Sequence, residues 1–114
     1  MATVYGQLGA SDLAATTLTA VYTVPASKRA SVNVTVTNRA DTPTNIRIAH
    51  IKNDVVGNVA VEDYLLFDLP TTALASNFSP ISFTGIIMTA GDVLAVRSSA
   101  SSVSAQVNGI EDDV

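Results

Sequence analysis

The chain has 114 residues, of which 47% are hydrophobic and 14% charged, with a net charge of −4 at pH 7 and no cysteine. This length and composition suit one folded domain with a single core. The six basic residues are scattered, which argues against a nucleic-acid partner because phosphate binding needs clustered Lys and Arg. Without cysteine the chain has no disulfide, thiolate chemistry or cysteine metal ligand. No apolar run reaches the roughly 20 residues of a membrane-spanning helix, so we expect no membrane partner.

Alternating apolar and polar residues recur along the whole chain and predict strands rather than helices. In "SVNVTVTN", residues 31–38, the valines fall on one face and Asn or Thr on the other. Strands are expected near residues 2–8, 17–24, 30–38, 45–52, 63–69, 79–88, 92–98 and 102–110. Turn-forming segments separate them at intervals of about 8–12 residues, which predicts an all-β, single-domain antiparallel fold of about eight strands, either a β-sandwich or a small barrel.

The segment "NRADTPTN" between two of these strands is rich in Asn, Asp, Thr and Pro, the residues that turn a chain. It favours a hairpin in which residues 31–38 pair with residues 45–52. The single histidine, His50, falls in the second of these strands on the face of Ile46 and Ile48. We expect it to pack at a strand end in a structural role.

Two segments are candidate interaction surfaces. Residues 1–10 are strand-like and end in Gly and Ala, so they are either a free N-terminal arm or the first strand of the sandwich. The loop at residues 53–62 contains four valines that form an apolar patch if they are exposed, although the loop is equally able to fold over an open end of the sandwich. The candidate interface residues are Thr3, Val4, Tyr5, Val55, Val56, Val59 and Val61. The acidic residues 111–114, "EDDV", are expected to form an exposed tail.

The sequence contains no recognisable catalytic, cofactor-binding or metal-binding motif. A Ser or Thr nucleophile needs a base, His50 is the only histidine, and no G-x-S-x-G stretch surrounds a serine. The carboxylates are spread along the chain, and the glycines form no phosphate-binding loop. We therefore expect a protein without cofactor that is not an enzyme.

The motifs "LTAVYTVPASKRASVNVTVTNR", "NIRIAHI", "FTGIIMTAGDVLAVRSS" and "VSAQVNGIED" follow one another from about residue 8 to residue 112. Their order resembles that of a family of small virion structural proteins from tailed bacteriophages. The resemblance implies a jelly-roll β-sandwich that acts as a capsid decoration, or cement, protein and carries no catalytic residues. Its implied partners are the major capsid protein and further copies of itself, as a homo-oligomer such as a trimer. The protein would be made in the host cytoplasm and reside on the capsid surface of the virion.

A second placement is a component of the phage tail, neck or fibre that serves attachment or binds a receptor or carbohydrate. Sugar-binding modules usually display aromatic rings, and the candidates are Tyr5, Tyr22 and Tyr64. Burial of these tyrosines would weaken the sugar-binding hypothesis. An enzyme would become plausible only if His50 lay exposed in a cleft beside a carboxylate.

Overall fold

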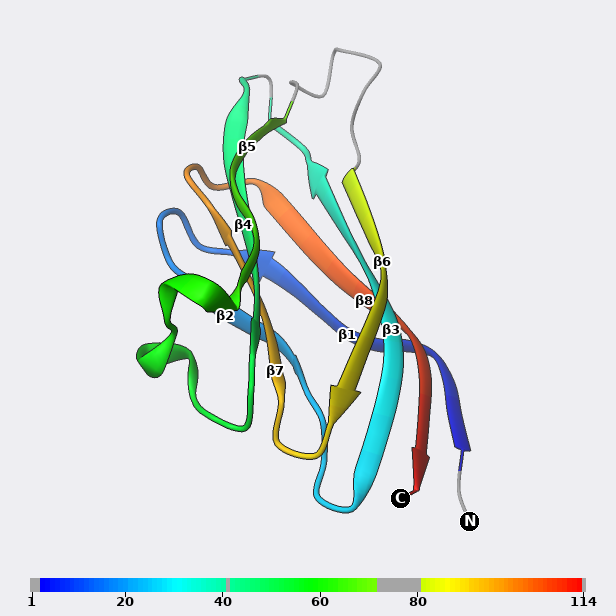
Figure 1. The fold of residues 1–114 in the computed structure, drawn as a ribbon. Helices are drawn as coiled ribbons and strands as arrows, with labels where there is room; N and C mark the ends of the chain where they lie inside the picture. The colour runs from blue at the N-terminus through cyan, green and yellow to red at the C-terminus, as the bar shows by residue number, and fades with distance from the viewer. Residues whose placement is uncertain (1–2, 41, 72–80, 114) are drawn as a thin grey trace.

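The computed structural model describes residues 3–40, 42–71 and 81–113. Eight strands account for most of them (Figure 1). They are β1 (Thr3–Leu13), β2 (Thr19–Thr23), β3 (Lys28–Asn38), β4 (Thr44–Ile51), β5 (Tyr64–Thr71), β6 (Ile81–Thr89), β7 (Val93–Ser98) and β8 (Val103–Asp113). All eight correspond to strands expected from the sequence; of the predicted strand residues, 2, 79 and 80 lie outside the described part.

The strands form two four-stranded antiparallel sheets, which pack as a sandwich. Sheet A has the order β1-β8-β3-β6 and sheet B the order β2-β7-β4-β5. The first strand pairs with the last, β2 with β7, β3 with β6 and β4 with β5. A long antiparallel ribbon rolled into two sheets produces this pairing, so the predicted jelly roll is confirmed.

The predicted hairpin of residues 31–38 with 45–52 is wrong. β3 pairs with β6 and β8 in sheet A, whereas β4 pairs with β5 and β7 in sheet B. A polar turn serves a crossing between sheets as well as a hairpin within one, so turn composition did not distinguish the two.

The main core lies between the sheets. Val32, Val34 and Val36 of β3 are almost fully buried, as their alternation predicts, and they pack in one cluster with Ile46 and Ile48 of β4. Each fully buried aliphatic side chain contributes roughly 1.5–3 kcal/mol. The expected inner face of the "SVNVTVTN" strand is therefore confirmed.

A second, smaller apolar cluster lies on the other face of sheet B. Its buried members are Ala49, Ile51, Val93 and Ala95, and Val56 and Val59 pack against them. These two valines belong to the loop that carries two short 3-10 turns, η1 (Val56–Asn58) and η2 (Val61–Asp63). The loop thus covers part of sheet B, which is why four successive residues of β7, from Val93 to Val96, are buried.

The expected acidic tail is wrong for the described residues 111–113, which continue β8 to Asp113; residue 114 lies outside the described part. Glu111 faces the core and accepts a hydrogen bond from the Tyr22 hydroxyl at 2.5 Å. Pairing with β3 and β1 on either side fixes the rest of the segment, since Lys28 lies opposite Asp113 and Thr3 opposite Asp112. The acidic composition suggested a solvated end, but pairing on both sides keeps the backbone of these residues in the sheet.

Candidate interaction surfaces

His50 and Asp92 lie together where β4 ends and β7 begins. His50 Nε2 is 2.9 Å from Asp92 Oδ2, and the Asp92 side chain is only 1% exposed. The same carboxylate accepts hydrogen bonds from the backbone N–H groups of Thr89, at 3.0 Å, and Asn53, at 3.1 Å. The Lys52 ammonium lies 3.5 Å from Asp92 Oδ1. Asp92 therefore joins the end of β4 to the turn between β6 and β7.

The surroundings of Asp92 keep its carboxylate ionised. Burial alone would raise the pKa of Asp92, but the hydrogen bonds from His50 and the Thr89 N–H, together with the charge of Lys52, outweigh burial and lower it. Backbone donors reach both carboxylate oxygens, so the group is engaged in fixing two chain segments. This geometry favours a structural role for the His50–Asp92 pair.

Within the residues that the structure describes, no three His, Asp or Glu side chains gather closely enough to hold a metal ion. Nor does this part of the chain contain a helix with the length and apolar character needed to cross a membrane.

The outer face of sheet A carries a row of exposed side chains that crosses all four strands. Tyr5 of β1 lies opposite Ile110 of β8, Ile110 opposite Ser31 of β3, and Ser31 opposite Ile87 of β6. We call Tyr5, Ile110, Ser31 and Ile87 the apolar row. The exposed fractions of its three large side chains are 72% for Tyr5, 44% for Ile110 and 68% for Ile87. Three large apolar side chains aligned on one face form a patch typical of a protein interface.

A groove of about 280 Å³ runs beside the centre of this row. The residues that line it are Arg29, Ala30, Ser31, Ile87, Ile110 and Asp112. Ser31 forms part of its floor between the two isoleucines, because the small side chain leaves space that a larger one would fill. The groove therefore offers an apolar slot about one side chain wide.

The neighbouring row on the same face is charged. It contains Thr3, Asp112, Arg29 and Thr89, again one residue from each strand. The Thr3 hydroxyl donates to Asp112 Oδ1 at 2.6 Å. Among the residues that the structure describes, Arg29 makes no ion pair. In the described part of the chain, an exposed guanidinium thus lies next to the apolar row without an ion-pair partner.

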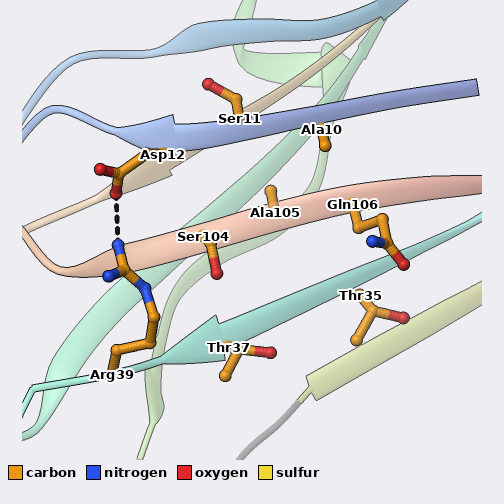
Figure 2. A pocket seen from close by; sticks show the side chains of 9 residues that line it. All are labelled: Ala10, Ser11, Asp12, Thr35, Thr37, Arg39, Ser104, Ala105 and Gln106. Atoms are coloured by element: carbon orange, nitrogen blue, oxygen red, sulfur yellow. Dashed lines mark hydrogen bonds and ion pairs between the residues drawn. The ribbon is translucent and has the colours of Figure 1, made fainter.

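Farther along the face lies a polar groove of about 480 Å³ (Figure 2). Its lining residues are Ala10, Ser11, Asp12, Thr35, Thr37, Arg39, Ser104, Ala105 and Gln106. The side chains of Thr35 and Thr37 from β3 lie beside Gln106 and Ser104 from β8, and an ion pair from Arg39 to Asp12 of β1 closes one end. None of the lining residues is aromatic, so the groove offers hydrogen bonds without a ring on which a sugar would stack.

A second apolar surface follows β5, an edge strand of sheet B. We call Leu65, Phe67 and Leu69 the β5 edge; all three are exposed, Phe67 by 58%. The Arg47 guanidinium lies 3.9 Å from the centroid of the Phe67 ring. Arg47 also donates to both carboxylate oxygens of Asp68, from Nε at 2.6 Å and from Nη2 at 3.1 Å. These contacts hold the Phe67 ring in place on the surface.

The sequence-predicted interface residues separate into two groups. The first group, Thr3, Val4 and Tyr5, is exposed and belongs to β1, which pairs with β8. Residues 3–10 are therefore part of the first strand of the sandwich and do not form a free arm. In the 53–62 loop, Val55 and Val61 are exposed, by 61% and 86%. Val56 and Val59 instead pack against sheet B, as the alternative of a folded-down loop expects.

Sequence reasoning missed Ile87, Ile110 and Phe67 as surface residues. The adjacent pair Ile86–Ile87 was a usable signal, because one of two neighbouring strand residues must point away from the core. Ile110 was also predictable, because the alternation that buries Val103, Ala105 and Val107 continues through β8 without a register shift against β3 and turns Ile110 outward. Phe67 gave no such signal, since it lies at a register shift between β4 and β5.

The chain was compared with known proteins at three levels. No protein-family model, no curated protein and no solved structure matches it.

Proposed function

We propose that this chain is a structural protein of a bacteriophage particle, and that it serves as a capsid decoration, or cement, protein. One observation carries the proposal: a single jelly roll displays two separate apolar surfaces, the apolar row on sheet A and the β5 edge on sheet B. A protein that bridges neighbours in a shell needs at least two such surfaces. The motif resemblance to small virion structural proteins supports the particle as the setting.

The chemistry of the surface supports an assembly role. Serine, threonine, asparagine and glutamine fill most of the remaining outer face of sheet A, where they offer many weak hydrogen bonds. Weak contacts are sufficient in a shell, because many copies bind together and their avidity adds. A chain without cysteine also keeps the same covalent structure inside and outside the cell.

We assign the β5 edge to the capsid subunit. Phe67 is an aromatic side chain held by Arg47, and pre-oriented aromatic residues commonly provide much of the binding energy of an interface. Among the residues that the structure describes, β5 is also the outermost strand of sheet B, and a strand of a partner can add to such an edge.

Binding to particles tests this assignment. Phage particles that lack this chain are mixed with purified protein and sedimented, using the wild type, Phe67→Asp and the control Ser101→Asp, which alters an exposed loop residue. We expect the wild type and Ser101→Asp to sediment with the particles and Phe67→Asp to remain in solution while retaining its far-ultraviolet circular dichroism spectrum. Failure of the wild type to bind any part of the particle would contradict the proposal.

The polar groove favours a second candidate, a fibre or tail module that binds carbohydrate. Its hydroxyl and amide side chains match the hydrogen bonding of a sugar. Against it, Tyr22 is buried and Tyr64 packs against the second apolar cluster, which leaves Tyr5 as the exposed tyrosine, outside this groove. A glycan array distinguishes the candidates: saturable glycan binding that Gln106→Ala removes would favour attachment over decoration.

A further inference from the structure

The two outer rows of sheet A, taken together, are complementary to themselves. The strands cross sheet A in the order β1, β8, β3 and β6. A second copy can be stacked on the outer face by a rotation of 180° about an axis that lies above this face, runs parallel to the strands and passes between β8 and β3. Each residue of β8 then faces the residue of β3 in the same row, and each residue of β1 faces the residue of β6. Since a rotation about this axis causes no shift along the strands, the register of the contact follows from symmetry alone.

This rotation pairs opposite charges. In the charged row, Arg29 of one copy faces Asp112 of the other, and the pair occurs twice because the axis relates the two copies. The Thr3 hydroxyl already donates to Asp112 Oδ1, and the carboxylate has a second oxygen for another donor. The contact also gives Arg29 the partner that it lacks among the described residues.

The same rotation fills the apolar groove. Ile110 of one copy is placed over Ser31 of the other, between that copy's own Ile110 and Ile87, where the groove has its floor. Tyr5 of each copy faces Ile87 of the other. In the next row Asn108 faces Asn33, and two side-chain amides can hydrogen-bond to each other.

The size of the face is adequate for a stable contact. β1, β3 and β8 each contain 11 residues, so with ordinary strand rise and spacing the four-stranded face covers roughly 700 Å². A standard interface buries about 800 Å² per partner. Stacking two sheets with their strands nearly aligned is also a common mode of sheet packing.

We propose that two copies of this chain form a two-fold dimer through the outer faces of sheet A, with Arg29 of each copy paired to Asp112 of the other and Ile110 of each copy seated in the groove over Ser31 of the other. The dimer forms in solution and does not depend on the proposed place in a particle. It leaves the β5 edge of each copy, which belongs to the other sheet, available to a different partner.

Sedimentation equilibrium of the purified full chain tests the proposal. We expect the wild type to be a dimer, and Ile87→Glu to weaken dimerisation by about tenfold or more because it places a carboxylate against Tyr5 of the other copy. Val61→Glu, the same kind of change at an exposed aliphatic residue on the loop beside sheet B, should leave the dimer intact. Circular dichroism checks that each variant is folded.

Charge reversal tests the orientation. Arg29→Asp and Asp112→Arg should each weaken dimerisation, because each places like charges across the interface, and the double variant should restore it. High salt should reduce the difference between the single variants and the wild type.

A monomer or a trimer at about 100 μM wild-type protein would overturn the proposal, as would a dimer that Val61→Glu disrupts and Ile87→Glu does not. A dimer in which the double charge reversal fails to restore what the single variants lose would overturn the orientation about this axis. A chain that sediments with particles but stays monomeric would contradict the dimer and leave the proposed function standing, whereas a dimer that binds no particle would do the reverse.

Discussion

The hydroxyl of Tyr22 in sheet B donates a hydrogen bond to the Glu111 carboxylate in sheet A, with 2.5 Å between the two oxygens. Both side chains are almost completely buried. This contact links the sheets near the end of β8, within a core that is otherwise mostly aliphatic. It places a carboxylate inside the sandwich with a neutral donor as its partner.

Replacing Tyr22 with Phe should therefore destabilise the protein by about 1.5–3 kcal/mol, because the Glu111 carboxylate remains buried without this donor. Urea unfolding at pH 7 measures the free energy of unfolding. The control Tyr5→Phe removes the hydroxyl of an exposed tyrosine and should change this free energy by less than about 0.5 kcal/mol. Equal effects of the two changes would show that the Tyr22–Glu111 contact adds no stability.

The same contact predicts a loss of stability in alkali. Burial, the hydrogen bond to Glu111 and the charge of Glu111 together raise the pKa of Tyr22. The folded state then keeps the phenol neutral at a pH where the unfolded chain ionises it. The contribution of the Tyr22–Glu111 contact to the free energy of unfolding is complete below about pH 10, the ordinary tyrosine pKa, and it declines as the pH rises further. Between pH 8 and about 11, the free energy of unfolding should fall more steeply with pH for the wild type than for Tyr22→Phe. Parallel curves for the two proteins would contradict the raised pKa.

The Asp92 carboxylate should cause a loss of stability in acid, the opposite pH dependence to that of Tyr22. Its pKa is lowered in the folded state, so its contribution is complete above the ordinary carboxyl pKa of about 4 and is lost as the pH falls through the lower pKa of the folded state. Asp92→Asn should cost about 1–3 kcal/mol at pH 7, and the difference from the wild type should shrink below about pH 4. Asp12→Asn, at a side chain that is 76% exposed, is the control and should leave the acid transition in place. A difference that stays constant down to pH 2 would contradict the lowered pKa.

Gly109 in β8 lies against the backbone of β3. A Cβ atom there would be 2.1 Å from the Ser31 carbonyl oxygen and 2.8 Å from the Val32 Cα atom, so a strand would have to move. Gly109→Ala should cost roughly 1–3 kcal/mol in the free energy of unfolding. Gly57→Ala, where nothing lies within 4 Å of the added atom, should be tolerated. Thermal unfolding compares the two, and equal stability would show that β8 shifts without cost.

The fold class followed from sequence because strand alternation is a local property. Val32, Val34 and Val36 repeat every second residue, and burial of one face of β3 explains the pattern. The path from β3 to β4 did not follow, since the same polar turn serves a hairpin and a crossing between sheets. Strand pairing decided this path: β8, from the far end of the chain, occupies the place beside β3 that a hairpin would give to β4.

The candidate surfaces were predicted only in part. Tyr5 and Val61 are exposed as expected, but the apolar row joins Tyr5 to Ile110 and Ile87, which are far apart in sequence. Only strand pairing brings these residues into one row. Val56 and Val59 were candidate interface residues but pack against sheet B. The sequence of a valine-rich loop does not show which of its valines are exposed and which are packed.

Cryo-electron microscopy of intact phage particles that carry this chain tests the proposed function most directly. Particles are purified from lysates in which mass spectrometry detects the chain, and the map is searched for an eight-stranded jelly roll. We predict density repeated over the icosahedral shell, with the β5 edge against a capsid subunit. Density confined to the tail or neck would contradict decoration in favour of attachment, and particles without this density would contradict the virion proposal itself.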